Sequence, residues 1–198
     1  MNFSKLITTS LLFLFALQLQ AQTNSKMKQY EPSEKYPYGQ PAPEMKDALK
    51  DFAPLIGICE CKSVNRNPDG TWQDTVDMLW QFKYILNGTA IQDETWKADN
   101  RSSSSIRQFN TDSLKWVVTY FGSSPKSWTP GTWIGDKQGD DIVLFMDQKA
   151  PNGMEGKSRL TFYDITAGGY KWKGEWIDKA ETIAYPFWTI DCRKKKVR

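Results

Sequence analysis

Short segments with alternating side chains dominate the sequence. In residues 78–86 every second side chain is large and apolar or aromatic, a period-two pattern that indicates a β-strand with one buried face. Asn87-Gly88 follows directly and is the preferred pair for a two-residue type I′ turn, after which residues 89–96 can return beside the first segment. This part of the chain therefore predicts an antiparallel hairpin.

Segments of the same kind recur along the chain, with turns rich in glycine, asparagine and aspartate between them. Short, aromatic-rich strands at regular spacing without intervening helices are typical of a sandwich or an up-and-down barrel, and closure removes exposed strand edges. We therefore predict an all-β fold, an antiparallel up-and-down barrel of about ten strands with a short N-terminal helix at one mouth. The predicted strands are residues 55–62, 78–86, 89–96, 104–109, 114–121, 127–134, 141–146, 158–165, 170–177 and 182–193.

The barrel domain is predicted to begin near residue 44. Residues 22–43 are polar and contain several prolines, so we expect a flexible leader there. Residues 43–52 carry apolar residues at helical spacing behind a proline, which predicts the short helix, and Pro54 ends it. Residues 44–198 form one domain of ordinary length with a basic C-terminal tail. The apolar positions of the predicted helix are Met45, Ala48, Leu49 and Phe52.

Residues 1–21 have the pattern of a secretory signal peptide. Lys5 supplies a positive start, residues 6–19 are mostly apolar, and Ala21 offers a small residue for cleavage. The alternative is a membrane anchor, but the run is shorter than the roughly 20 apolar residues that a spanning helix needs. We therefore expect an exported protein, periplasmic or extracellular, without stable membrane insertion.

The complete absence of histidine excludes several kinds of site. A Ser-His-Asp or Cys-His nucleophilic centre, an imidazole zinc site and a histidine-ligated haem all require that residue. Three cysteines are too few for a cysteine-only zinc site, and no spaced acidic loop of the EF-hand kind is present. We therefore assign no catalytic residue, no metal and no cofactor.

Charge patterning suggests no partner of opposite charge. The chain has 26 lysines and arginines against 23 acidic residues, and the two signs are interspersed. A nucleic-acid-binding protein would normally show a basic stripe or patch, whereas the one cationic run, residues 193–198, lies at the terminus. We expect no nucleic-acid partner, and the sequence leaves the oligomeric state open.

The three cysteines suggest one disulfide that joins the two ends of the domain. Export to an oxidising compartment favours pairing of two thiols. Cys59 and Cys61 lie two positions apart on one predicted strand, about 7 Å from each other, which disfavours a bond between them. Cys192 therefore pairs with one of the two; both pairings stay open, and we favour Cys59–Cys192, with Cys61 free or bonded to another group.

Aromatic residues are predicted to line the barrel interior. On several strands one face carries lysines and the other carries tryptophans or tyrosines, whose amphipathic rings commonly line ligand pockets of roughly 300 to 1,000 Å³. The alternative is that these rings fill the barrel completely, as side chains do in some small barrels. The candidate ligand-binding aromatics are Trp80, Trp116, Tyr120, Trp133, Trp172 and Trp176.

Three charged residues at strand positions complete the candidate ligand-binding set: Glu94, Arg107 and Arg159. A charge turned into a barrel needs a partner, so Glu94 could pair there with Arg107 or Arg159. A salt bridge on the outer surface is the plainer alternative. Nothing in the sequence fixes the carboxylate separation that acid and base hydrolysis would require.

The pattern resembles the calycin superfamily, in particular lipocalin-like domains of exported bacterial proteins. The resemblance covers residues 44–194 and is carried by the short helix, the Leu-x-Gly start of the first strand at residues 55–57, the Asn-Gly hairpin and a last strand that ends in basic residues. It implies a barrel that binds lipids, retinoids or other small hydrophobic molecules. Haem-binding members use histidine, which this chain lacks.

One position departs from the superfamily pattern. Members commonly carry Gly-x-Trp on the opening strand, with the tryptophan packed under a basic residue from near the last strand. Gly57 matches the glycine and Arg193 is a candidate for the basic residue, but Cys59 occupies the tryptophan position. The resemblance thus suggests that a Cys59–Cys192 bond replaces the stacked pair.

Three hypotheses for function follow. The first is an exported protein that binds a small, largely apolar molecule in the barrel mouth. The second is a hydrolase or isomerase that uses Glu94 with an arginine at that mouth. The third is an interaction module with a solid barrel. The fold alone does not choose among these three hypotheses.

Overall fold

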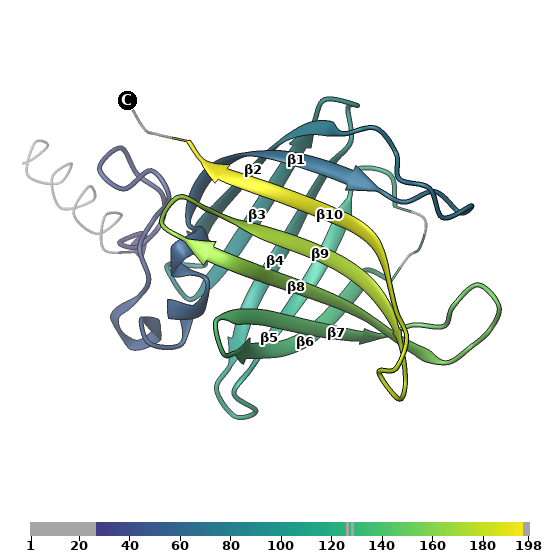
Figure 1. Cartoon of the computed structure of the whole chain (residues 1–198). Coiled ribbons are helices and arrows are strands. Elements are labelled where there is room, and N and C mark those ends of the chain that lie inside the picture. The colour runs from purple at the N-terminus through teal and green to yellow at the C-terminus, as the bar shows by residue number, and fades with distance from the viewer. Residues whose placement is uncertain (1–26, 126, 128, 196–198) are drawn as a thin grey trace, which may run out of the picture.

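The chain folds into a closed barrel of ten antiparallel strands (Figure 1), as predicted. The computed structural model describes residues 27–125, 127 and 129–195. Each strand pairs with its neighbours in sequence, and β1 pairs with β10 to close the sheet. The strands are β1 (Gly57–Asn65), β2 (Val76–Ile85), β3 (Ala90–Lys97), β4 (Ser102–Asn110), β5 (Lys115–Gly122), β6 (Gly131–Gln138), β7 (Asp141–Asp147), β8 (Gly156–Thr166), β9 (Gly169–Asp178) and β10 (Ala184–Lys194).

The predicted hairpin forms between β2 and β3 in the expected register, but its turn spans the four residues 86–89 instead of Asn87-Gly88 alone. Ile85 pairs with Ala90, and the two consecutive residues with positive φ at the start of the turn are Leu86 and Asn87. Gly88 follows with φ 80°, and a Cβ on it would come within 2.5 Å of backbone atoms of the N-terminal segment. The close approach of that segment therefore requires the glycine here.

One end of the barrel is covered by three short 3-10 helices, η1 (Pro43–Met45), η2 (Leu49–Asp51) and η3 (Ala53–Leu55). The short helix expected at this mouth is thus present as three separate 3-10 turns. Leu49, Phe52 and Leu55 are fully buried and spaced by three, which matches the three-residue period of a 3-10 helix. The ring of Phe52 packs edge-on against Trp116 at a centroid distance of 4.6 Å, so this end is closed.

Residues 27–42, the described part of the predicted leader, follow a defined course over the β2–β3 turn. The backbone N–H of Tyr30 donates to Asn87 Oδ1 (3.0 Å), and that of Asn87 donates to Glu31 Oε1 (2.5 Å). Ala42 N–H donates to the carbonyl of Gly88 at 2.9 Å. The segment thus adds a second layer over the closed end.

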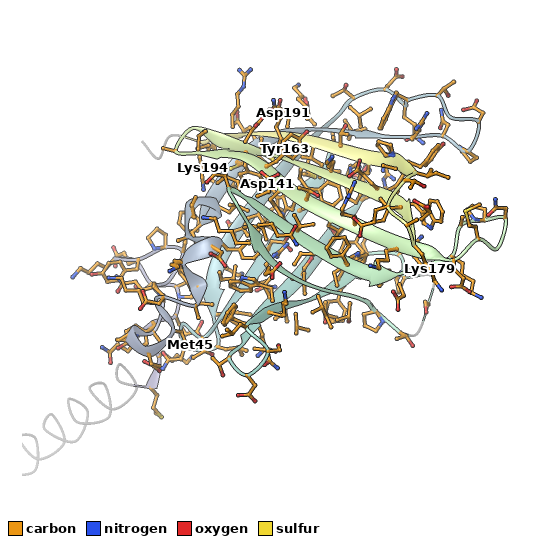
Figure 2. The ribbon with its side chains drawn as sticks, turned by 60° about the horizontal axis from the view of Figure 1, so that its bottom comes forward. Met45, Asp141, Tyr163, Lys179, Asp191 and Lys194 are labelled. Atoms are coloured by element: carbon orange, nitrogen blue, oxygen red, sulfur yellow. A yellow bond between two sulfur atoms is a disulfide. The ribbon has the colours of Figure 1, made fainter. Side chains whose placement is uncertain are left out.

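The opposite end carries long loops. The β1–β2 and β7–β8 connections extend from it (Figure 1), and Lys179 in the β9–β10 turn lies far from Met45 of η1 (Figure 2). The two ends of the barrel therefore differ: one is covered by the N-terminal segment and the other is flanked by loops only.

The disulfide joins Cys61 and Cys192, so the predicted Cys59–Cys192 bond is wrong. In the pairing of β1 with β10, Cys61 lies directly opposite Cys192 with Cα atoms 4.1 Å apart, whereas Cys59 lies opposite Lys194. A bond from Cys59 would have to cross the ladder diagonally, over a longer Cα separation. Cys59 is a free and buried thiol. The expected disulfide between the first and last strands is made by Cys61 instead.

Cutting the unfolded, unreduced protein after glutamate tests this pairing, because Glu60 separates the two candidate cysteines. We expect mass spectrometry to find the Cys61 peptide linked to the Cys192 peptide; a linked Cys59 peptide would contradict the register. The Cys192→Ser variant should lose about 2 to 4 kcal/mol of unfolding free energy in urea, because the bond closes a long loop. Cys59→Ala, which keeps the bond, should lose less.

Two ionisable groups are buried beside this seam. Burial raises the pKa of the Cys59 thiol above its ordinary value of 9.0, although nearby Lys194 lowers it. Burial also raises the pKa of the Tyr170 hydroxyl well above its ordinary 10.0. Since both pKa values are higher in the folded state, the stability from keeping these groups neutral is complete below the unfolded-state values and is lost as pH rises through the folded-state values.

We therefore expect the free energy of unfolding to fall in the alkaline range, as pH rises above the ordinary thiol value of 9.0. Tyr170→Phe removes one of the two groups, so this variant should lose less stability over the same range. Urea unfolding followed by fluorescence at each pH measures the difference, with Tyr36→Phe as the control at an exposed tyrosine. Equal losses in the two variants would show that Tyr170 does not contribute.

Candidate ligand-binding cavity

The half of the barrel away from the 3-10 helices contains a cavity of about 710 Å³. Its size lies within the range of small-molecule sites in proteins. Every strand except β1 contributes to its walls, which are mainly aromatic and aliphatic. The lining residues that carry the argument below are Trp80, Trp172, Trp188, Phe162, Thr95 and Ser105.

One wall consists of aromatic rings in mutual contact. Trp172 lies between Trp80, at a centroid distance of 6.2 Å, and Trp188, at 5.0 Å, both edge-on. Phe162 contacts Trp80 at 5.6 Å. Rings held this way have little freedom to turn into the empty space, so this wall is rigid and apolar.

The facing wall, on β3 and β4, carries small hydroxyl side chains. Thr95 pairs with Ser103 and Asp93 pairs with Ser105 across the two strands, so all four lie on the inner face. The hydroxyls of Thr95 and Ser103 are 2.6 Å apart and share a hydrogen bond. This wall can bind hydroxyl or carbonyl groups of a ligand.

An ion pair forms the floor of the cavity. Arg107 Nη2 lies 2.9 Å from Asp93 Oδ2, and both side chains are almost fully buried. The same carboxylate accepts a hydrogen bond from Trp80 Nε1 (2.7 Å) and one from the backbone N–H of Ser105 (2.6 Å). The carboxylate is thus fully engaged by protein groups, as a buried charge requires.

The guanidinium of Arg107 is enclosed by three phenyl rings. It lies over Phe82, Phe52 and Phe162 at 4.8, 5.2 and 5.7 Å from their centroids. Its Nε and Nη1 have no hydrogen-bond partner among the described residues and are shielded from solvent, so the ring faces stabilise the charge. Asp93 and these rings together surround the guanidinium of Arg107. This cluster separates the half of the barrel that contains the cavity from the half packed against the 3-10 helices.

A smaller pocket of about 120 Å³ adjoins the cavity at its mouth and shares Thr95, Ser103, Tyr120 and Trp188 with it. Its basic residues are Lys97, the last residue of β3, and Arg101, which directly precedes β4.

Lys97 is held in place at this mouth. Its Nζ donates to Asn65 Oδ1 at 3.3 Å and lies 5.3 Å from the centre of the Trp188 ring. Burial, and then the charge of Arg101, lower the pKa of Lys97. Arg101 itself is paired with Asp99, with Nε 2.8 Å from Oδ2. The mouth therefore has one cation more than its described carboxylates balance.

Five of the nine candidate ligand-binding residues line the cavity: Trp80, Arg107, Tyr120, Trp133 and Trp172. The structure thus brings together most of the aromatic candidates that were chosen from the alternation of side chains along the predicted strands.

Two aromatic candidates lie elsewhere. Trp116 points into the barrel at the closed end, where its Nε1 donates to Asp51 Oδ2 at 3.1 Å. Trp176 donates from Nε1 to the backbone carbonyl of Gln148 at 2.9 Å, and its ring lies so close to Gly156 that a Cβ there would clash. Both rings are used in packing rather than in the cavity wall.

Glu94 and Arg159 are on the outer surface. Glu94 pairs with Lys83 at 2.7 Å, and Arg159 pairs with Glu175 at 3.0 Å. The suggested pairing of Glu94 with Arg107 or Arg159 inside the barrel does not form, and the plainer alternative of outer salt bridges holds for both. The partner of Arg107 is Asp93, one residue before Glu94, and sequence reasoning missed it.

No protein-family model matches the sequence, and no curated protein does. Among solved structures, the chain is similar to the crystal structure of Rv2717c from M. tuberculosis, with 12% identity and a TM-score of 0.54, over 79% of this chain and 100% of that one. It also matches the S-type phycobiliprotein lyase CPES from Guillardia theta, with 9% identity and a TM-score of 0.48, over 80% and 100% of the two chains. The likeness to Rv2717c concerns the fold alone.

Within residues 27–125, 127 and 129–195, no group of three histidine, cysteine or acidic side chains is arranged to hold a metal ion. The described residues also include no helix long and apolar enough to cross a membrane.

The adjacent acidic residues Asp93 and Glu94 provide a matched test of the floor. Asp93→Asn leaves the buried charge of Arg107 without its counter-ion, so we expect a loss of about 3 to 5 kcal/mol of unfolding free energy. Glu94→Gln removes a partly exposed ion pair, whose side chains are 24% and 30% exposed, and should lose less than about 1 kcal/mol. Urea unfolding of both variants measures the contrast. Similar small losses would mean that the ion pair does not hold the floor together.

Proposed function

We propose that this is an exported protein that binds a small, largely apolar ligand inside its barrel. The observation that carries the proposal is the cavity of about 710 Å³ between the rigid wall of Trp80, Trp172 and Trp188 and the hydroxyl-bearing wall of β3 and β4. A concave, mainly apolar space with a few polar groups is the usual form of a small-molecule site. The Cys61–Cys192 disulfide is compatible with export.

The other two hypotheses have less support. The enzymatic one required Glu94 beside a pocket, and Glu94 lies on the outer surface in a pair with Lys83. Asp93, which does reach the cavity, is already hydrogen-bonded to Arg107, Trp80 and Ser105. The interaction-module hypothesis assumed a solid barrel, and the cavity removes that assumption.

Titration with N-phenyl-1-naphthylamine, an uncharged fluorescent probe, tests the proposal. We expect saturable probe fluorescence with quenching of tryptophan emission. Leu160→Trp should weaken binding about tenfold or more, because Leu160 lines the cavity and a larger ring fills it. Tyr163→Trp, on the outer face of the same strand (Figure 2), adds the same residue outside the barrel and should leave binding unchanged.

Absence of a saturable response in the unaltered protein, or equal binding by both variants, would contradict binding inside the barrel. Native mass spectrometry of the protein purified from its own host would then identify any ligand that stays bound.

A further inference from the structure

The two ends of the cavity differ in their charge. Among the described residues that line the main cavity, the charged side chains are Asp93 and Arg107, and they neutralise one another at the floor. Lys97 lies on the same inner face of β3, four residues beyond Asp93 and therefore about 13 Å farther along the strand. The floor is thus neutral and the mouth is positive.

The floor is a poor place for a further charge. Arg107 Nε and Nη1 are shielded behind the rings of Phe52, Phe82 and Phe162, so a ligand in the cavity does not reach them. A ligand anion placed there would add an unbalanced negative charge beside Asp93 and lose its hydration without gaining a partner.

The mouth offers what the floor lacks. Among the described residues no carboxylate pairs with Lys97, whereas the other cation there, Arg101, has Asp99. The hydroxyl-bearing residues Thr95, Ser103 and Tyr120 line both the small pocket and the main cavity, so the two spaces can hold one continuous ligand. A cation with adjoining hydroxyl donors is suited to a carboxylate or another small anionic group.

We propose that the ligand is an anionic amphipath, bound with its apolar chain toward Trp80 and Phe162 and its anionic group at the mouth beside Lys97. This inference rests on the proposed function and adds the charge and the direction of the ligand. Lys97 is the residue that distinguishes an anionic ligand from a neutral one.

Three probes with the same twelve-carbon chain test the proposal: dodecanoate, 1-dodecanol and dodecylammonium. In Lys97→Gln, dodecanoate should bind about tenfold more weakly because a charge-assisted contact is lost. The affinity for 1-dodecanol should be unchanged, and that for dodecylammonium should rise because a repulsion is removed. Lys83→Gln is the matched control, since Lys83 lies on the outer face of neighbouring β2 and should not affect any of the three.

The direction of the ligand can be seen with 12-bromododecanoate. In a crystal of the complex, we expect the anomalous signal of bromine near Trp80 and Phe162, and the carboxylate near Lys97. Bromine at the mouth would overturn the proposed direction.

The outcomes separate this inference from the function on which it rests. If none of the three probes binds the unaltered protein, the proposed function fails. If dodecanoate and 1-dodecanol both bind and Lys97→Gln changes both equally or neither, the cavity stands as a binding site and the anionic subsite is overturned. Thermal unfolding of the variant verifies that it remains folded.

Discussion

The pairing of β1 with β10 is the constraint on which the rest of the structure depends. Without it the chain would be an open sheet with two exposed edges, and its concave face would enclose nothing. The register of this pair also decides which side chains point inward, because a slip by one residue would turn each of them to the other face. The Cys61–Cys192 bond fixes that register at one point, where both cysteines belong to the inner face.

Once the barrel is closed, the Asp93–Arg107 pair divides its interior. On one side Phe52, Trp116 and their neighbours are buried and pack against the 3-10 helices. On the other side the side chains line the walls and enclose the cavity. A buried ion pair adds little net stability, but removing one of its two partners leaves an unpaired buried charge and lowers the free energy of unfolding strongly. Together with the phenyl rings around Arg107, it makes a firm floor between the half packed against the 3-10 helices and the half that contains the cavity.

The sequence predicted the architecture well because alternation and turn residues are local signals. It failed for the disulfide, which depends on the register between two strands. The choice between Cys59 and Cys61 required the β1–β10 register, and no local pattern specifies a pairing across most of the chain. The short helix at the mouth was predicted from local spacing, and the step from Phe52 to Leu55 across Pro54 divides it into single 3-10 turns.

The misplacement of Glu94 has a different cause, because its correct face could be read from the sequence. A hairpin in which residues 78–86 pair with residues 89–96 places Ile91, Asp93 and Thr95 on the same face as Trp80, and Glu94 on the other. The same parity places the serines of the run 102–105 alternately inside and outside, with Ser103 and Ser105 inside. Such small side chains cannot reach the rings of Trp172 and Trp188 on the facing wall, and those rings are held back by contacts with one another. The cavity thus follows from an unequal distribution of side-chain volume around a closed barrel, with small polar residues facing large aromatic ones.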